Sequence, residues 1–190
     1  MSAAGAPLAD GFLDWWFAPW NLGGPPPPFP PDASPLARRH GYRAWCDALG
    51  VPADLPPTWD AGWQAAAVAD AALLRRAASL YAALLAARAN EPARLAALPL
   101  AERRWCMGIA ITQPLQPLSA PAASLQAWGL AELAGALEHG FAGLWPRLRL
   151  VLGMAATEVP RSDAAPTSRR LRCWRLCLER AARIDIGEAA

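Results

Sequence analysis

Two cysteines have a spacing that could support metal chemistry. Cys173 and Cys177 lie four residues apart in a stretch that predicts a helix, which would place both thiols on one side of it. They could supply two of the four ligands that a tetrahedral metal site needs. The other two would have to come from the remaining His40, Cys46, Cys106 and His139. We favour the interpretation that Cys173 and Cys177 are reduced thiols packed beside Trp174.

Paired carboxylates are the second arrangement that could do chemistry. Glu132 and Glu138 are six residues apart, and Asp10 and Asp14 are four apart. Neither pair lies in an apolar setting that would separate two carboxyl pKa values for acid–base work, so we interpret them as solvated. No nucleophile elbow, zinc-protease motif or P-loop motif occurs. We expect no enzyme and no cofactor, and a metal-dependent or redox enzyme is the alternative that elemental analysis and thiol titration would test.

The charge of the chain is unevenly distributed. All eighteen cationic residues are arginines, which we attribute mainly to the composition bias of an Ala-, Arg- and Pro-rich chain. The net charge of +2 is too small for a general attraction to nucleic acid or membranes. Residues 1–37 carry three Asp and no Arg, whereas residues 161–183 carry seven Arg against two acids. The two ends of the chain therefore differ in charge and could address different partners.

A protein-binding surface is the chemistry that this pattern favours. Arginine and tryptophan are enriched where interfaces concentrate binding energy. The expected docking residues are four arginines of the last helix and two tryptophans near the start of the chain, namely Arg169, Arg172, Arg175, Arg183, Trp15 and Trp16. A nucleic-acid surface is disfavoured because a Leu/Trp stripe shares the last helix and the rest of the chain adds few cations. We expect neither nucleic acid nor a small-molecule substrate.

The elements that must position these residues are helices. With 190 residues, 54% hydrophobic residues and ten Trp, the chain can bury one sizeable core without metal or disulfide. We expect a mainly α fold: a single compact domain of about six to seven helices over 34–190, after an aromatic and Pro-rich, partly irregular segment at 1–33. The expected helices are 35–49, one from Thr58 or Asp60 to about Ala89, 91–98, 100–112, 125–139 and 168–184. For 147–152, a short strand and a helical turn are both open.

We expect no secretory signal peptide, because no cationic start precedes a hydrophobic run. We also expect no membrane-spanning helix, because the longest uncharged span, 105–131, is interrupted by three prolines. We expect a cytoplasmic protein.

Several stretches resemble a known protein family. They are LLRRAASLYAALLAAR (73–88), ARLAALPLAERRWCMGIA (93–110), WGLAELAGALEHGF (128–141) and LWPRLRLVL (144–152). Their order is similar to that of the sorting-platform accessory subunit of bacterial type III secretion systems, the SctK (YscK-like) family. The resemblance implies a non-catalytic cytoplasmic adaptor that links the cytoplasmic domain of the inner-membrane ring protein to the pod protein. It would meet the membrane only indirectly, through the ring protein. The alternative is a secretion-associated chaperone or another small helical protein-binding module.

Overall fold

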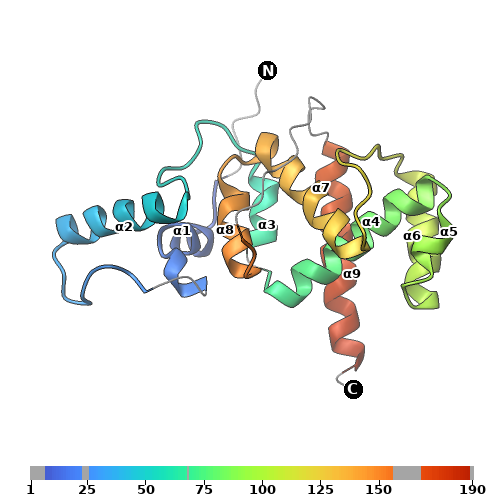
Figure 1. Ribbon diagram of the computed structural model, residues 1–190, viewed down its shortest axis with the longest axis horizontal. Helices are drawn as coiled ribbons and strands as arrows, with labels where there is room; N and C mark the ends of the chain where they lie inside the picture. Colours follow the sequence, from blue (N-terminus) through green and yellow to red (C-terminus); the bar gives the residue numbers. More distant parts are fainter. Residues whose placement is uncertain (1–6, 23–25, 68, 156–167, 189–190) are drawn as a thin grey trace. The chain divides into compact units, whose positions relative to one another are not determined.

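The computed structural model describes residues 7–22, 26–67, 69–155 and 168–188. Within these ranges all regular structure is helical, with nine α-helices and two short 3-10 helices (Figure 1). The prediction of a mainly α fold is confirmed, and the number of helices is slightly higher than expected. Helix α8 covers Leu144–Val151, so the strand considered for 147–152 is wrong.

The chain divides into two compact units. Unit 1 comprises Met1–Val68 and Gly140–Glu158, and unit 2 comprises Ala69–His139 and Val159–Ala190. The boundary expected between residues 33 and 34 lies inside unit 1.

Unit 1 is built from short helices around aromatic side chains. Its elements are α1 (Asp10–Phe17), η1 (Pro19–Leu22), α2 (Pro35–Leu49), η2 (Ala61–Trp63), α3 (Gln64–Ala67) and α8. Phe12 and Trp16 on α1 are buried, and their ring centroids lie 5.4 and 5.6 Å from that of Phe141. A second buried group on α2 and the turn after it consists of Trp45, Cys46 and Val51.

The ends of α2 follow directly from local sequence. The Ser34 hydroxyl accepts a hydrogen bond from the amide of Ala37, and Pro35 occupies the first turn, where its missing N–H costs nothing. Gly50 ends the helix at a φ of 62°, a conformation that suits glycine. The expected helix at 35–49 is confirmed at both ends.

Unit 2 is organised around one buried helix, α4 (Ala71–Arg88). The other helices of this unit are α5 (Pro92–Leu95), α6 (Leu100–Thr112), α7 (Leu125–Gly140, with its last residue in unit 1) and α9 (Ser168–Glu188). Helices α5, α6 and α9 all pack against α4, and Figure 1 shows α9 crossing it. Every residue of α4 from Leu80 to Ala86 is buried.

Helices α4 and α7 approach so closely that no side chain separates them at one point. A Cβ atom added to Gly129 on α7 would lie 1.8 Å from the carbonyl oxygen of Ala78 on α4. Glycine is therefore required at 129 by space, although it lowers intrinsic helix stability by about 1 kcal/mol relative to alanine.

Some expected helix boundaries are wrong. The single helix expected from about 58 to 89 is divided, because Asp60 caps η2 and Asp70 caps α4 through its bond to the amide of Leu73. Helix α5 is shorter than 91–98, and α9 extends beyond Ile184 to Glu188.

Candidate protein-binding surface

Helix α9 has a buried face and an exposed face. Cys173, Trp174, Cys177 and Ala181 are buried, and the ring of Trp174 stacks on that of Tyr81 of α4 at 4.6 Å between centroids. The exposed residues include the four expected docking arginines, Arg169, Arg172, Arg175 and Arg183. The sequence prediction thus placed these four on the correct side of the helix.

The arginine face contains a shallow hollow. Its volume is 310 Å³, and Arg172 and Arg175 line it together with Leu171, Leu176 and Glu179. Two guanidinium groups beside two partly buried leucines offer both hydrogen-bond donors and apolar contact. A guanidinium donates in a planar fork that matches a carboxylate, so the hollow suits an acidic protein surface with aliphatic side chains.

Arg170, which also lies on α9, points inward and forms a buried ion pair. Its Nη1 lies 3.5 Å from Oε2 of Glu132 on α7, and its Nη2 donates to the carbonyl oxygen of Gln116 at 2.6 Å. Glu132 is only 1% exposed, so its interpretation as a solvated carboxylate is wrong.

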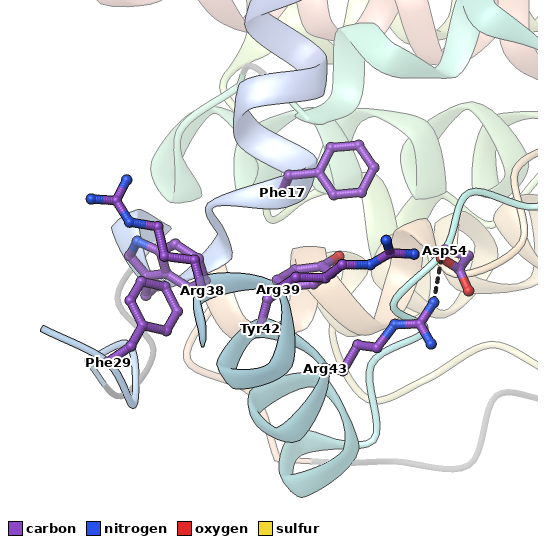
Figure 2. Close-up of a pocket in the computed structure, with 8 residues that line it drawn as sticks. Phe17, Phe29, Arg38, Arg39, Tyr42, Arg43 and Asp54 are labelled. Carbon is purple, nitrogen blue, oxygen red and sulfur yellow. Dashed lines mark ion pairs between the residues drawn. The ribbon is translucent and has the colours of Figure 1, made fainter. Parts of the chain in front are cut away.

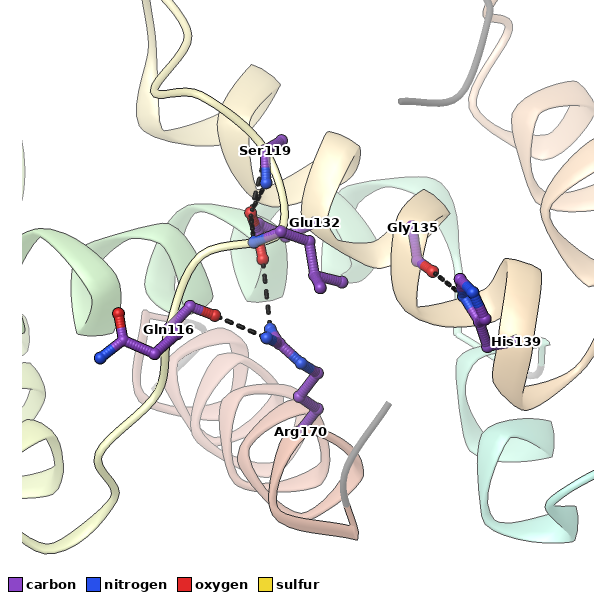
Figure 3. Close-up of polar contacts among 7 residues, drawn as sticks. Gln116, Ser119, Glu132, Gly135, His139 and Arg170 are labelled. Carbon is purple, nitrogen blue, oxygen red and sulfur yellow. Dashed lines mark hydrogen bonds and ion pairs between the residues drawn. The ribbon is translucent and has the colours of Figure 1, made fainter. Parts of the chain in front are cut away.

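The other carboxylate oxygen of Glu132 binds residues 118 and 119, in the loop between α6 and α7. Oε1 accepts from the amides of Leu118 and Ser119, each at 2.7 Å, and from the Ser119 hydroxyl at 2.9 Å (Figure 3). A buried carboxylate with this many donors is satisfied, and it ties α7, residues 116–119 and α9 together. The orientation of the exposed arginines on α9 is therefore fixed by a buried polar network.

The two tryptophans expected at a docking surface lie elsewhere. Trp16 is 0% exposed and Trp15 is partly buried. The guanidinium of Arg147, itself fully buried, covers the Trp16 ring in the interior of unit 1. Trp16 is therefore a core residue, and it does not belong to an exposed surface.

The thiols are all free and buried. Burial raises the pKa of Cys106 to about 12 and that of Cys177 well above its ordinary value. The interpretation of Cys173 and Cys177 as packed thiols beside Trp174 is confirmed. In the part of the chain that the structure describes, no three His, Cys, Asp or Glu side chains gather where they could hold a metal ion.

The remaining titratable candidates are exposed. Asp10, Asp14 and Glu138 face solvent, as expected. His40 and His139 are exposed as well, and Nδ1 of His139 lies 3.3 Å from the carbonyl oxygen of Gly135 (Figure 3). None of these groups is enclosed in a cavity with another.

Among the described helices, none combines the length and the apolar character that crossing a bilayer requires. The chain matches no protein-family model, and neither a curated protein nor a solved structure matches it.

Proposed function

We propose that this protein is a non-catalytic adaptor of a bacterial type III secretion sorting platform. In this role it links the cytoplasmic domain of the inner-membrane ring protein to the pod protein, and it stays in the cytoplasm, held at the inner membrane through these partners. The resemblance of residues 73–152 to the SctK family supplies the partners. The observation that carries the binding role is the arginine face of α9.

The arginine face has the chemistry of a docking surface. Over residues 168–183 of α9, where the exposure of each side chain is described, Glu179 is the one exposed acid beside the four exposed arginines. Such exposed charges mainly set the orientation and the rate of encounter with an acidic partner. The leucines of the hollow add apolar contact that stabilises the complex once it has formed.

The chemistry of the thiols supports a binding role over a catalytic one. A cysteine nucleophile must be available as a thiolate, and reactive cysteines have a lowered pKa and partial exposure. Here burial raises the pKa of all four thiols. They are consequently protonated and enclosed near neutral pH.

Charge reversal on α9 tests the proposal. We expect the Arg172→Glu/Arg175→Glu variant to lose pull-down of the ring or pod protein by at least about tenfold, which is about 1.4 kcal/mol of binding free energy. The matched control is Arg88→Glu/Arg104→Glu, which makes the same change in net charge at exposed residues of α4 and α6. Its binding should be unchanged, and both variants should unfold at the temperature of the unmodified protein.

Two results would contradict the proposal. Equal loss in both variants would show a general charge effect, and unaltered binding by the α9 variant would exclude this face. Recovery of one exported protein, in place of the ring and pod proteins, would favour the chaperone alternative.

A further inference from the structure

Unit 1 contains an aromatic pocket that the proposed function does not use. Its volume is 450 Å³. Four aromatic side chains form its apolar walls: Phe17 at the end of α1, Trp20 of η1, Phe29 before α2, and Tyr42 of α2 (Figure 2). The rings contact one another: the centroid of Trp20 lies 5.2 Å from that of Phe29, and the centroid of Phe17 lies 5.8 Å from that of Tyr42. The space is large enough for one large side chain.

The walls of this pocket are held in place before any ligand arrives. The Tyr42 hydroxyl donates to the carbonyl oxygen of Ala53 at 2.7 Å and accepts from Nη2 of Arg147 at 2.9 Å. The Phe29 ring lies against the backbone of α2 at Gly41, where an added Cβ would come within 2.5 Å of the ring. Glycine within a helix is otherwise unfavourable, so its presence at 41 is explained by the room it leaves for Phe29.

Three arginines of α2 line the same pocket against a single acid. Arg43 pairs with Asp54 at 3.5 Å, with both side chains largely exposed. Arg38 donates to the carbonyl oxygens of Ala33 and Pro31, which are neutral and leave its charge uncompensated. Arg39 has no hydrogen-bond or ion-pair partner among the described residues, and Figure 2 shows it on the same side of α2 as Tyr42 and Arg43.

We propose that this pocket binds an acidic peptide segment of a partner protein, in which a large apolar side chain is flanked by aspartate or glutamate. The apolar side chain would enter between the four aromatic rings, and the flanking carboxylates would pair with the guanidinium groups of Arg38 and Arg39. Aromatic and arginine side chains around one pocket are the composition of an interface hot spot.

The observed charges favour a peptide over a nucleic acid. Strands of nucleic acid are held by basic grooves that follow the phosphate backbone over several nucleotides. Here the cations are confined to one side of a pocket, and Asp54 lies at its edge. A peptide with one large apolar side chain and two or three neighbouring carboxylates matches the size and the charge of this pocket.

Binding of short peptides to the full chain tests this site. The probe is a labelled peptide of one Leu between two runs of three Glu, and we expect saturable binding in fluorescence anisotropy. Replacing its Leu by Ala, or its Glu residues by Lys, should weaken binding by at least about tenfold. A single-stranded oligonucleotide of equal charge should bind more weakly than the Leu peptide.

Variants assign the binding to the pocket. Arg39→Glu should weaken binding of the Leu peptide by about tenfold or more, and Arg39→Lys should retain most of it. Gly41→Ala should also weaken binding, because the new methyl group displaces Phe29 while the charge stays the same. Arg172→Glu/Arg175→Glu is the matched control, which should bind the peptide normally, so failure of the α9 proposal and failure of this one are distinguishable.

Several outcomes would overturn the proposal. These are no saturable binding of the Leu peptide up to about 1 mM, equal affinity for the Leu and Ala peptides, tighter binding of the oligonucleotide, or unchanged affinity of Arg39→Glu. Self-association of the unmodified chain that Arg39→Glu abolishes would assign the pocket to a second copy instead. Thermal unfolding of each variant shows whether a lost affinity comes from lost folding.

Discussion

The guanidinium of Arg147 stacks on the ring of Trp16, with its Cζ atom 3.5 Å from the ring centroid. Its nitrogens donate to four neutral acceptors, which are the carbonyl oxygens of Trp16, Gly143 and Pro52 and the hydroxyl of Tyr42. Burial lowers the pKa of Arg147, and Tyr42 partly offsets this effect. One cation on α8 thus joins Trp16, Tyr42 and Pro52, which lie between 95 and 131 residues away from it in the sequence.

Replacing Arg147 should destabilise the protein strongly. Arg147→Met keeps an apolar stem but removes every donor to the four acceptors, and each acceptor that stays buried without a donor costs about 1–3 kcal/mol. The matched control is Arg149→Met, because Arg149 is partly exposed and donates to one carbonyl oxygen, that of Leu49. Urea unfolding measures both. Equal losses of unfolding free energy in the two variants would refute the central role of Arg147.

The buried ion pair between Glu132 and Arg170 should show strong coupling. Glu132→Leu alone leaves the buried charge of Arg170 unpaired and removes the acceptor of two backbone amides and the Ser119 hydroxyl, and we expect a loss of about 3–5 kcal/mol. Adding Arg170→Met removes the uncompensated charge, so the double variant should be more stable than the sum of the single effects predicts. Glu138→Leu is the exposed control and should change stability by less than about 0.5 kcal/mol. Strict additivity in a double-mutant cycle would show that the pair does not interact.

Two glycine-to-alanine substitutions should change the free energy of unfolding in opposite directions. Gly129→Ala gains helix propensity but drives a methyl group into the backbone of α4. We expect it to lower the free energy of unfolding by about 3 kcal/mol or more. Gly108→Ala on α6 meets nothing within 4 Å and should stabilise the protein by about 0.5–1 kcal/mol. Denaturant midpoints measure both effects. A neutral Gly129→Ala variant would contradict the close approach of α7 and α4.

Stability should fall in alkaline solution. A thiol whose pKa is raised on folding stabilises the folded state below the pKa of the unfolded thiol, and this contribution is lost as the pH rises through the folded value. For Cys106 that interval extends from 9.0 to about 12, and Cys177 shifts in the same direction. We expect the urea midpoint to decrease from about pH 8 to about pH 10.5, and to decrease less in Cys106→Ala. A midpoint that is constant over this interval would contradict the burial of the thiols.

Thiol accessibility gives an independent check of the same burial. A thiol reagent should react slowly with the native protein at neutral pH, because all four cysteines are buried and their pKa values are raised. In denaturant all four should react at once. Rapid reaction of one native thiol would identify an exposed cysteine and reopen the redox alternative.

The sequence predicts the structure best where the determining residues are neighbours in the chain. Ser34, Pro35 and Gly50 act within a few positions of the helix ends that they define, and α2 was placed correctly at both ends. The region from 58 to 89 contains more than one residue able to cap a helix. A single helix that begins at Thr58 or Asp60 would join α3 to α4, but Asp70 caps α4 as a separate helix.

The buried charges could not be placed in the same way. Glu132 and Arg170 are 38 residues apart, and the hydroxyl of Tyr42 is 105 residues from Arg147. A signal was present for Glu132, since apolar residues surround it in sequence on both sides, which is unusual for a solvated carboxylate. The Arg and Leu alternation around Arg147 left a strand and a helical turn both open, because period two is the pattern of a half-buried strand but Val151 and Leu152 break it.

The tight packing of α4 limits how this protein can change over time. Ala77, Ala78, Ala82, Ala83 and Ala86 are completely enclosed, and the backbone of Gly129 touches one of them directly. Larger residues do not fit there, so substitutions of alanine should be tolerated on the outer surface and rejected at these positions. Whatever the genomic origin of the many alanines in this chain, those on the buried face of α4 are retained because there is no space for a larger side chain.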